Sequence, residues 1–326
     1  MANSPDTHAA GKHGRLRHVA ITGAALAAAA LVNRWAARRA ERALPPAGRF
    51  VEVGGVRLHY TEQGQGTPVV LIHGSGALVE DFTVSGLVEL LSSDHRVLVF
   101  DRPGYGYSDR PRGVDWTPER QAKLLVDACS ALGIGQPVVV GHSWGTLVAL
   151  AWALDHRERL SGLVLLSGYY FPTIRLDALP TALAGSPVVG DVIVNTVAPL
   201  QARVTGPLGN RMIFSPARPT PEFLEQMPFE LMLRPRQLHA TSVDSARMPG
   251  AAKRLSMRYD ELADVPVTIL WGDGDRLVWQ KDQSARLAAM LPGANAIPVA
   301  GAGHMIHHLA PETVAKAIRE LSGRRD

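Results

Sequence analysis

The chain has 326 residues, of which 46% are hydrophobic and 20% are charged, a composition that supports a large core and excludes a disordered chain. The formal net charge is +4, but residues 1–49 hold eight basic and two acidic residues and carry +6, which leaves −2 for residues 50–326. The main body of the chain therefore lacks the basic excess that would indicate nucleic-acid binding. Its single cysteine, Cys129, excludes an intramolecular disulfide.

Residues 1–48 are predicted to form a segment that is directed to a membrane. Residues 19–32 carry no charge, and basic residues flank them on both sides. This run is shorter than the roughly 20 apolar residues that cross a bilayer, unless Arg34 is included and extends its charge to the surface. We expect an uncleaved membrane anchor with anionic membrane lipid as a partner. A signal removed on export, and a peripheral helix or plain extension of a cytoplasmic protein, remain alternatives.

From residue 49 onward, short apolar runs alternate with helical patterns. Strands are predicted at 50–53, 69–72, 97–100, 138–140, 163–166 and 267–271, with a further short strand ending near residue 299. Thr117 and Pro118 are typical of a helix start, and Pro311 opens a final helix. Such alternation predicts an α/β fold with a mostly parallel central sheet and helices on both faces, in one catalytic domain over residues 49–326.

The alternation stops between about residues 169 and 262. This stretch is rich in proline and contains short helical patterns at 222–226 and 229–233. A long insertion between two core strands predicts a helical cap that covers the site and shapes the substrate pocket. Its large apolar residues either line an acyl pocket or pack the cap's own core, and the sequence leaves both readings open for Tyr169, Tyr170, Phe171, Met212, Phe214, Phe229 and Met232.

Residues 141–145 read Gly-His-Ser-Trp-Gly, directly after the apolar run 138–140 and before an apolar helical pattern at 146–154. A serine at a sharp strand-to-helix turn has an exposed hydroxyl and a strained backbone, and the flanking glycines make room for the turn. Ser143 is therefore a candidate nucleophile, provided that the chain also supplies a base and an acid.

A base and an acid follow in the chain. His304 ends a glycine-rich loop that begins at Gly301, and the predicted strand 267–271 is followed by Asp273 and Asp275. A carboxylate on that loop can accept the Nδ1 proton of His304 and hold its ring in the orientation that general-base catalysis requires. The chain order Ser, Asp, His is that of α/β-hydrolases and differs from the orders in chymotrypsin and subtilisin.

On these motifs the chain resembles the α/β-hydrolase superfamily over roughly residues 50–324. Further support comes from His-Gly-Ser-Gly at 73–76, Asp-Arg-Pro-Gly-Tyr-Gly-Tyr-Ser at 101–108 and Trp-Gly-Asp-Gly-Asp at 271–275. The resemblance implies the α/β-hydrolase fold, Asp275 as the acid with Asp273 as the alternative, and no cofactor. It further implies an oxyanion hole formed by the backbone N–H groups of Ser75 and Trp144.

Other polar residues near these motifs are assigned no chemistry. The resemblance implies that His73, Asp101 and Arg102 brace loops. His307 and His308 follow His304, but no Asp, Glu or Cys accompanies them at metal-ligand spacing, so we expect no metal.

A serine nucleophile forms an acyl-enzyme, which predicts attack on a carbonyl, of the carboxylic-ester type, in a small substrate with an apolar acyl part. Haloalkane dehalogenases and soluble epoxide hydrolases, which look similar along the chain, attack through a carboxylate at this position, so Ser143 disfavours those reactions. Carbon–carbon bond hydrolysis, a cofactor-free perhydrolase-like reaction and acyl transfer remain alternatives. A non-catalytic binding module is a further alternative.

Overall fold

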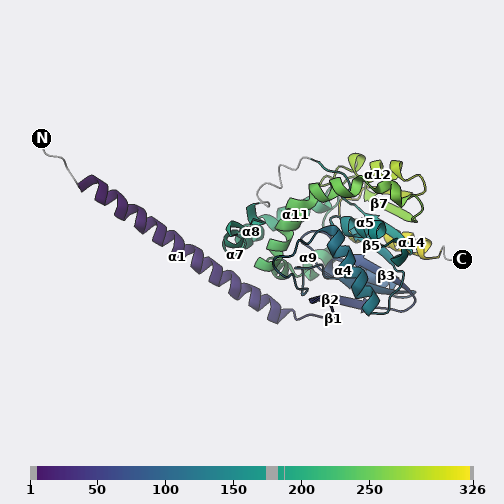
Figure 1. Cartoon of the computed structure of the whole chain (residues 1–326), viewed down its shortest axis with the longest axis horizontal. Helices are drawn as coiled ribbons and strands as arrows, with labels where there is room; N and C mark the ends of the chain where they lie inside the picture. Colours follow the sequence, from purple (N-terminus) through teal and green to yellow (C-terminus); the bar gives the residue numbers. More distant parts are fainter. Residues whose placement is uncertain (1–5, 174–182, 187, 324–326) are drawn as a thin grey trace.

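An eight-stranded sheet organises the body of the molecule in the computed structural model, which describes residues 6–173, 183–186 and 188–323 (Figure 1). The strand order is β1-β2-β4-β3-β5-β6-β7-β8; β1, β2 and β4 pair antiparallel and all other neighbours pair parallel. The predicted α/β fold class is confirmed. The strands are β1 (Arg49–Val53), β2 (Val56–Gln63), β3 (Thr67–Ile72), β4 (His95–Phe100), β5 (Val138–His142), β6 (Gly162–Leu166), β7 (Val267–Gly272) and β8 (Asn295–Val299).

Strand β2 is missing from the sequence prediction. Its many polar residues obscure the apolar alternation that would indicate a strand. The Gly54-Gly55 pair that precedes it is the sequence signal that could have indicated a hairpin here. Both glycines have positive φ, 55° and 72°, as a tight hairpin turn requires. The hairpin lays β1 against β2 at the edge of the sheet.

Alternating side chains of the central strands pack into two separate hydrophobic cores, one on each face of the sheet. On one face Val70, Ile72 and Val139 pack with helices α4 and α5, and on the other Val69 and Leu71 pack with α3 and α14. Continuous apolar runs are what a parallel sheet needs when both of its faces are covered. The covering helices are α2 (Glu80–Val84), α3 (Leu87–Leu91), α4 (Pro118–Ala131), α5 (Gly145–Asp155), α12 (Ser284–Met290), α13 (Ile306–Leu309) and α14 (Pro311–Ser322), with the short 3₁₀ turns η1 (Arg157–Arg159) and η4 (Gln280–Asp282).

The segment between β6 and β7 is helical and lies over one end of the sheet (Figure 1). Its short helices α9 and α10 match the predicted patterns, but α8 and α11 are longer than expected and continue through Pro207 and Pro249. An internal proline removes one helical hydrogen bond, which neighbouring packing can offset. Residues 174–182 and 187 of the predicted cap lie outside the described residues. The described elements are α7 (Val189–Thr196), α8 (Ala198–Phe214), α9 (Pro221–Gln226), α10 (Phe229–Met232), α11 (Pro235–Ser256) and η3 (Tyr259–Leu262).

Helix α1 (Asp6–Ala43) projects from the body in Figure 1. Its stretch Arg17–Ala43 is long and apolar enough to cross a membrane by length and composition, a property that anchors and signal sequences share. The last part of α1 packs on the segment between β6 and β7. Asn33 Nδ2 donates to the carbonyl oxygens of Asn195 and Thr196 at 2.9 and 2.8 Å, and Arg234 pairs with Glu41 at 2.9 Å.

The turn from β5 into α5 leaves no room for a side chain at its second glycine. A Cβ on Gly145 would overlap the carbonyl oxygens of Ile72 and His73, the latter at 2.7 Å. Because these oxygens belong to the backbone, they cannot move aside without shifting β3. The close approach holds the start of α5 against the end of β3.

We therefore predict that Gly145→Ala lowers the free energy of unfolding by about 2–3 kcal/mol through overpacking. Urea unfolding of the full chain in detergent micelles, followed by tryptophan fluorescence, measures the change. Gly250→Ala is the matched control, because a Cβ at this exposed position in α11 meets nothing within 4 Å. An equal effect of the two substitutions would contradict the close approach.

Candidate active site

Ser143 lies at the turn between β5 and α5, where its backbone takes a left-handed φ of 51°. Its N–H donates to the carbonyl oxygen of Leu166 at the end of β6, at 2.9 Å. A non-glycine residue in this region costs free energy and persists only where its surroundings impose it. Here the sheet and α5 hold the strained residue, and the Ser143 side chain lines a cavity.

His304 and Asp275 are brought together from two neighbouring loops. The separation from His304 Nδ1 to Asp275 Oδ2 is 2.8 Å, and both side chains are buried. The backbone N–H of His304 donates to the carbonyl oxygen of Ile213 on α8 at 2.9 Å. The histidine is thus positioned both by the carboxylate and by the segment that covers the sheet.

The two aspartates after β7 have different surroundings. Asp273 Oδ1 accepts the N–H of Gly301 at 2.8 Å in an exposed bond, which supports the loop before His304. Asp275 Oδ1 accepts hydrogen bonds from the N–H groups of Leu277 and Val278 at 2.9 and 3.0 Å. These two bonds fix the orientation of the carboxylate, in which the other oxygen, Oδ2, faces His304. Of these two carboxylates, Asp275 is the one that contacts His304.

The carboxyl group of Asp275 favours its charged form. Burial alone would raise its pKa, but the charge of His304, the hydrogen bond from its ring and two backbone N–H donors together lower the pKa below the ordinary value. An ionised carboxylate at this place can accept the Nδ1–H of His304 and stabilise an imidazolium.

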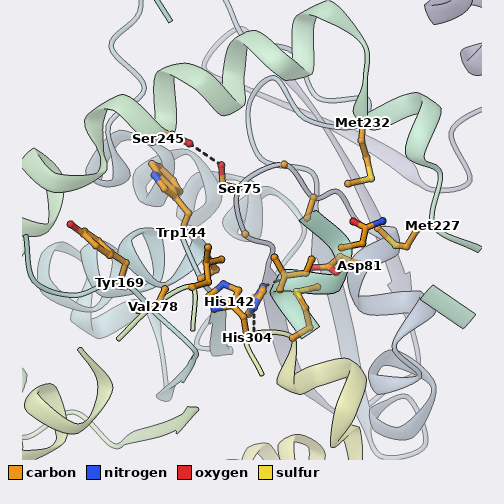
Figure 2. A pocket seen from close by; sticks show the side chains of 18 of the residues that line it. Ser75, Asp81, His142, Trp144, Tyr169, Met227, Met232, Ser245, Val278 and His304 are labelled. Carbon is orange, nitrogen blue, oxygen red and sulfur yellow. Dashed lines mark hydrogen bonds and ion pairs between the residues drawn. The ribbon is translucent and has the colours of Figure 1, made fainter. Parts of the chain in front are cut away.

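Ser143 and His304 line the same cavity of about 210 Å³. Met227 and Met232 lie across it from Trp144 (Figure 2). Tyr169 and Met232 are the two lining residues that the sequence had offered as pocket candidates, whereas Met212 is exposed and Phe214 is buried against Phe223. The sequence missed Ile213, Phe223, Met227, Met248, Leu277, Val278 and Met305, whose apolar character alone does not separate lining from packing.

Ser75 and Trp144 also line this cavity (Figure 2). Neither backbone N–H donates to a carbonyl within the described residues. Unpaired N–H groups beside a serine are suited to bind an oxygen that gains negative charge. The Ser75 hydroxyl lies 3.5 Å from that of Ser245 on α11, so the loop after β3 also meets the segment between β6 and β7.

The Arg102 guanidinium is buried at the centre of the loops around the cavity. It donates to the carbonyl oxygens of His73 and Gly74, each at 3.0 Å, and to Asp244 Oδ2 on α11 at 2.7 Å. Asp244 also accepts from Arg110 at 2.9 Å and from the Tyr105 hydroxyl at 3.0 Å.

The indole of Trp144 completes this arrangement. Its Nε1–H donates to the backbone carbonyl of Asp244 at 3.0 Å, and Arg102 lies 4.3 Å from the centre of its ring. Arg102 and Asp244 therefore connect the loop after β3, the start of α5 and helix α11 through one buried ion pair.

His73 and Asp101 brace loops, as the resemblance implies. His73 Nδ1 donates to the carbonyl of Gly74, and its Nε2 accepts the N–H of Arg102. Burial, and then the charge of Arg102, lower the pKa of His73 to about 4, so the ring is neutral at pH 7. Asp101 accepts from His59 at 2.7 Å and from the N–H groups of Val79 and Tyr107, each at 2.9 Å.

A second buried cluster lies behind the serine turn, and no spacing in the sequence revealed it. Asp81 comes to within 3.3 Å of His307 Nε2 and 3.0 Å of His308 Nε2, and the three ligand atoms lie within 4.8 Å of one another, as a metal site would require. This contradicts the expectation that no carboxylate accompanies these histidines. Asp81 Oδ1 forms a hydrogen bond with His308 Nε2, whereas Asp81 Oδ2 and His307 Nε2 are buried without a hydrogen-bond partner among the described residues. The absence of a metal stays a prediction.

In this cluster Asp81 favours its ionised form, whereas His307 and His142 favour their neutral forms. Burial would raise the pKa of Asp81, but the charge and hydrogen bonds of His307 and His308 lower it well below the ordinary value. Burial lowers the pKa of His307 and of His142, whose ring lies 5.0 Å from that of His304. Asp81 and His142 themselves line the cavity, so this cluster places an ionised carboxylate and the neutral ring of His142 at the cavity wall.

Comparison with known families gives one match over most of the chain. The model described as the alpha/beta hydrolase fold matches residues 67–311, which include all five residues predicted to form the site.

Individual relatives differ in their reactions. Haloalkane dehalogenase 2 of Mycobacterium tuberculosis is 25% identical over 293 residues, 86% of this chain and 96% of that protein. The 2-hydroxymuconate semialdehyde hydrolase of Pseudomonas putida is 37% identical over 130 residues, which cover 39% of this chain and 46% of that protein. The structure of a thermophilic esterase from Thermogutta terrifontis is 26% identical with a TM-score of 0.67, and covers 84% of this chain and 97% of its own.

We predict that Asp244→Asn lowers the free energy of unfolding by about 3–5 kcal/mol, because it leaves the Arg102 guanidinium buried without its counter-charge. Urea unfolding of the full chain in micelles measures the loss. Asp191→Asn is the control: its pair with Arg112 is exposed and 3.5 Å long, and its removal should cost about 0–1 kcal/mol. A loss at Asp244 no larger than at Asp191 would show that the buried pair does not hold α11 against the loops around the cavity.

Proposed function

The chain belongs to the alpha/beta hydrolase fold family and is a hydrolase; from that premise we propose that it hydrolyses carboxylic esters through Ser143, His304 and Asp275. The observation that carries this proposal is the strained turn at Ser143, which opens into the same cavity as a histidine paired with a buried, ionised carboxylate. These three residue types in this arrangement supply a nucleophile, a general base and an orienting acid.

In the first half of the proposed reaction, Ser143 Oγ attacks the ester carbonyl carbon while His304 Nε2 takes the hydroxyl proton. Asp275 accepts the Nδ1–H of His304 and stabilises the resulting imidazolium. The carbonyl oxygen becomes an oxyanion that the N–H groups of Ser75 and Trp144 stabilise. When the tetrahedral intermediate collapses, His304 returns the proton to the leaving alcohol and an acyl-enzyme remains.

In the second half, water takes the place of the alcohol. His304 removes a proton from the water as its oxygen attacks the acyl carbon, and the same two N–H groups stabilise the second oxyanion. Collapse releases the carboxylic acid and returns the proton to Ser143. No metal or cofactor takes part in these steps. An acceptor other than water at this stage would make the enzyme an acyltransferase.

The lining of the cavity supports a neutral substrate with an apolar acyl part. Four methionines line it, and their flexible side chains adapt to extended apolar groups: Met227, Met232, Met248 and Met305. Among the described residues, no lysine or arginine lines the cavity, so a substrate carboxylate would meet no fixed cation there.

The two sequence relatives described above carry names that point to two other reactions. Dehalogenation is disfavoured, because the dehalogenases of this superfamily attack through a carboxylate where this chain has Ser143. Carbon–carbon bond hydrolysis is the second candidate, because the local identity with the 2-hydroxymuconate semialdehyde hydrolase is 37%. We favour the ester because the lining lacks a cation for an acidic substrate.

We also propose that α1 is retained as a membrane anchor. A segment removed as a signal needs no fixed contacts with the mature protein, whereas Asn33 and Glu41 bond to the cap and Ala40 is buried against it. The helix is long and apolar enough for this role by composition.

We predict that Ser143→Ala lowers kcat by about 10⁵–10⁶-fold and abolishes covalent labelling by a fluorophosphonate, because the attacking oxygen is lost. The assay uses p-nitrophenyl esters of increasing acyl length, lactones and a vinylogous diketone, so that it also separates ester from carbon–carbon hydrolysis.

Ser245→Ala is the matched control, since this hydroxyl lines the same cavity but does not lie at the turn. It should keep its labelling. If Ser143→Ala is still labelled, the assignment of Ser143 as the nucleophile is wrong. Turnover only in the presence of an added alcohol or thiol would identify an acyltransferase, and a folded chain that neither labels nor turns over would favour a binding module.

The two aspartates after β7 give a second prediction. Asp275→Asn should lower kcat by about 10⁴-fold, because an amide at this place favours the wrong tautomer of His304. Asp273→Asn should lower kcat less than about tenfold, since among the described residues the Asp273 carboxylate bonds to the N–H of Gly301 in the loop and not to His304. The same ester assay measures both variants. A larger loss at Asp273 would reverse the assignment of the acid.

A further inference from the structure

Most of the exposed large apolar side chains in the described residues lie on α1 or between residues 183 and 212; those exposed elsewhere are Leu44, Leu224, Met257, Leu277, Trp279 and Met290. Across the described residues from 50 to 173, no large apolar side chain is exposed, whereas such side chains are frequent on α1 and on α7 and α8. Isolated exposed apolar residues are ordinary on soluble proteins, but a contiguous group marks a contact surface. Figure 1 shows α7 and α8 at the end of the body that α1 passes.

On α8 the exposed residues form a regular stripe. Leu200, Val204, Leu208 and Met212 are spaced four residues apart, and each is between 57% and 74% exposed. Residues at this spacing share one face of a helix. We call these four residues the α8 stripe.

The start of the α8 stripe lies beside the point where α1 leaves the body. Asn33 on α1 donates to the carbonyl oxygens of Asn195 and Thr196, the last two residues of α7, and α8 begins at Ala198. Between Arg17 and Val32, α1 is mostly exposed, and this part holds more than half of the apolar stretch Arg17–Ala43 that could span a membrane. A bilayer that holds this stretch would have its surface close to the α8 stripe.

The charges at this level of α1 suit an anionic lipid surface. Arg34, Arg38 and Arg39 are exposed there, and Arg39 lies 5.5 Å from the ring centre of the exposed Trp35. Tryptophan with arginine is typical of the head-group level of a membrane, where the ring is amphipathic and the guanidinium binds phosphate.

The same helix also borders the site. Asn210 and Ile213 line the cavity, while the α8 stripe points away from the body into solvent. Helix α8 therefore separates the surface that carries the α8 stripe from the cavity that holds Ser143.

We propose that the α8 stripe is a second membrane contact, which lies in the surface of the anionic bilayer that holds α1, and that the site takes esters dissolved in that bilayer. The choice of substrate rests on the proposed ester hydrolysis, whereas the membrane contact does not.

A fluorescent label tests the contact directly. The chain's only cysteine, Cys129, is buried, and burial raises the pKa of its thiol to about 12, so it resists labelling. Val204→Cys and the control Met257→Cys, both at exposed positions, are labelled with a polarity-sensitive dye in the full chain. The labelled proteins are placed in vesicles of phosphatidylcholine and phosphatidylglycerol at about 7:3 and, separately, in detergent micelles.

The dye at position 204 should shift its emission to the blue in vesicles and be quenched by lipids that carry a quencher near the head group, whereas the dye at 257 should not. A dye at 204 that stays in water would overturn the proposal. Energy transfer between labelled copies, without quenching by lipid, would also overturn it, because a second copy would then cover the stripe.

Activity tests the substrate class. Leu200→Gln with Leu208→Gln should lower hydrolysis of a long-chain ester in vesicles by about tenfold, as the partial burial of two leucines is lost, and leave a soluble short-chain ester unaffected. Equal loss on both esters, or on neither, would overturn the choice of substrate. If wild-type protein hydrolyses neither ester, the proposed function fails, while the dye still decides the membrane contact.

Discussion

The buried guanidinium of Arg102 is the group on which the arrangement of the site most depends. It binds two carbonyl oxygens of the loop after β3, stacks against Trp144 beside the serine turn and pairs with Asp244 of α11. A buried charge destabilises the fold unless it is paired and hydrogen-bonded. If one of these partners moved alone, the guanidinium would be left buried without that partner, which is unfavourable. These contacts fix the loop that carries Ser75 relative to the turn that carries Trp144. They also fix both of these segments relative to helix α11.

The segment between β6 and β7 contacts the site on one side and α1 on the other. Its inner side lines the cavity through Ile213 and Met248 and positions His304 through the Ile213 carbonyl. Its outer side carries exposed apolar residues and the contacts with α1. If α8 contacts a bilayer as proposed, the apolar cavity lies next to the phase in which apolar esters concentrate, and access from that phase would avoid transferring the acyl chain through water.

Charge is distributed around the cavity in a way that fits a neutral substrate. Asp81 at the cavity wall and Asp275 behind His304 both favour their ionised forms, the latter mainly through the charge of His304, while burial lowers the pKa of His73 and of His142 so that both rings are neutral at pH 7. The proposed reaction creates negative charge only transiently, on the oxygen near Ser75 and Trp144. Fixed dipoles at that point stabilise the transition state without binding a charged ground state, which is the condition for raising kcat.

The sequence by itself determined the sheet, with the exception of β2, and the identity of the candidate site residues. These follow from local rules: buried parallel strands read as continuous apolar runs, and the serine turn needs Gly145 where β3 passes. Only the tertiary structure decided which carboxylate faces His304, which cap residues line the cavity, and that Asp81 and Asp244 reach partners more than a hundred residues away. Such contacts depend on how the elements pack, and an apolar residue in a helix looks the same in sequence whether it faces a core, a cavity or a membrane.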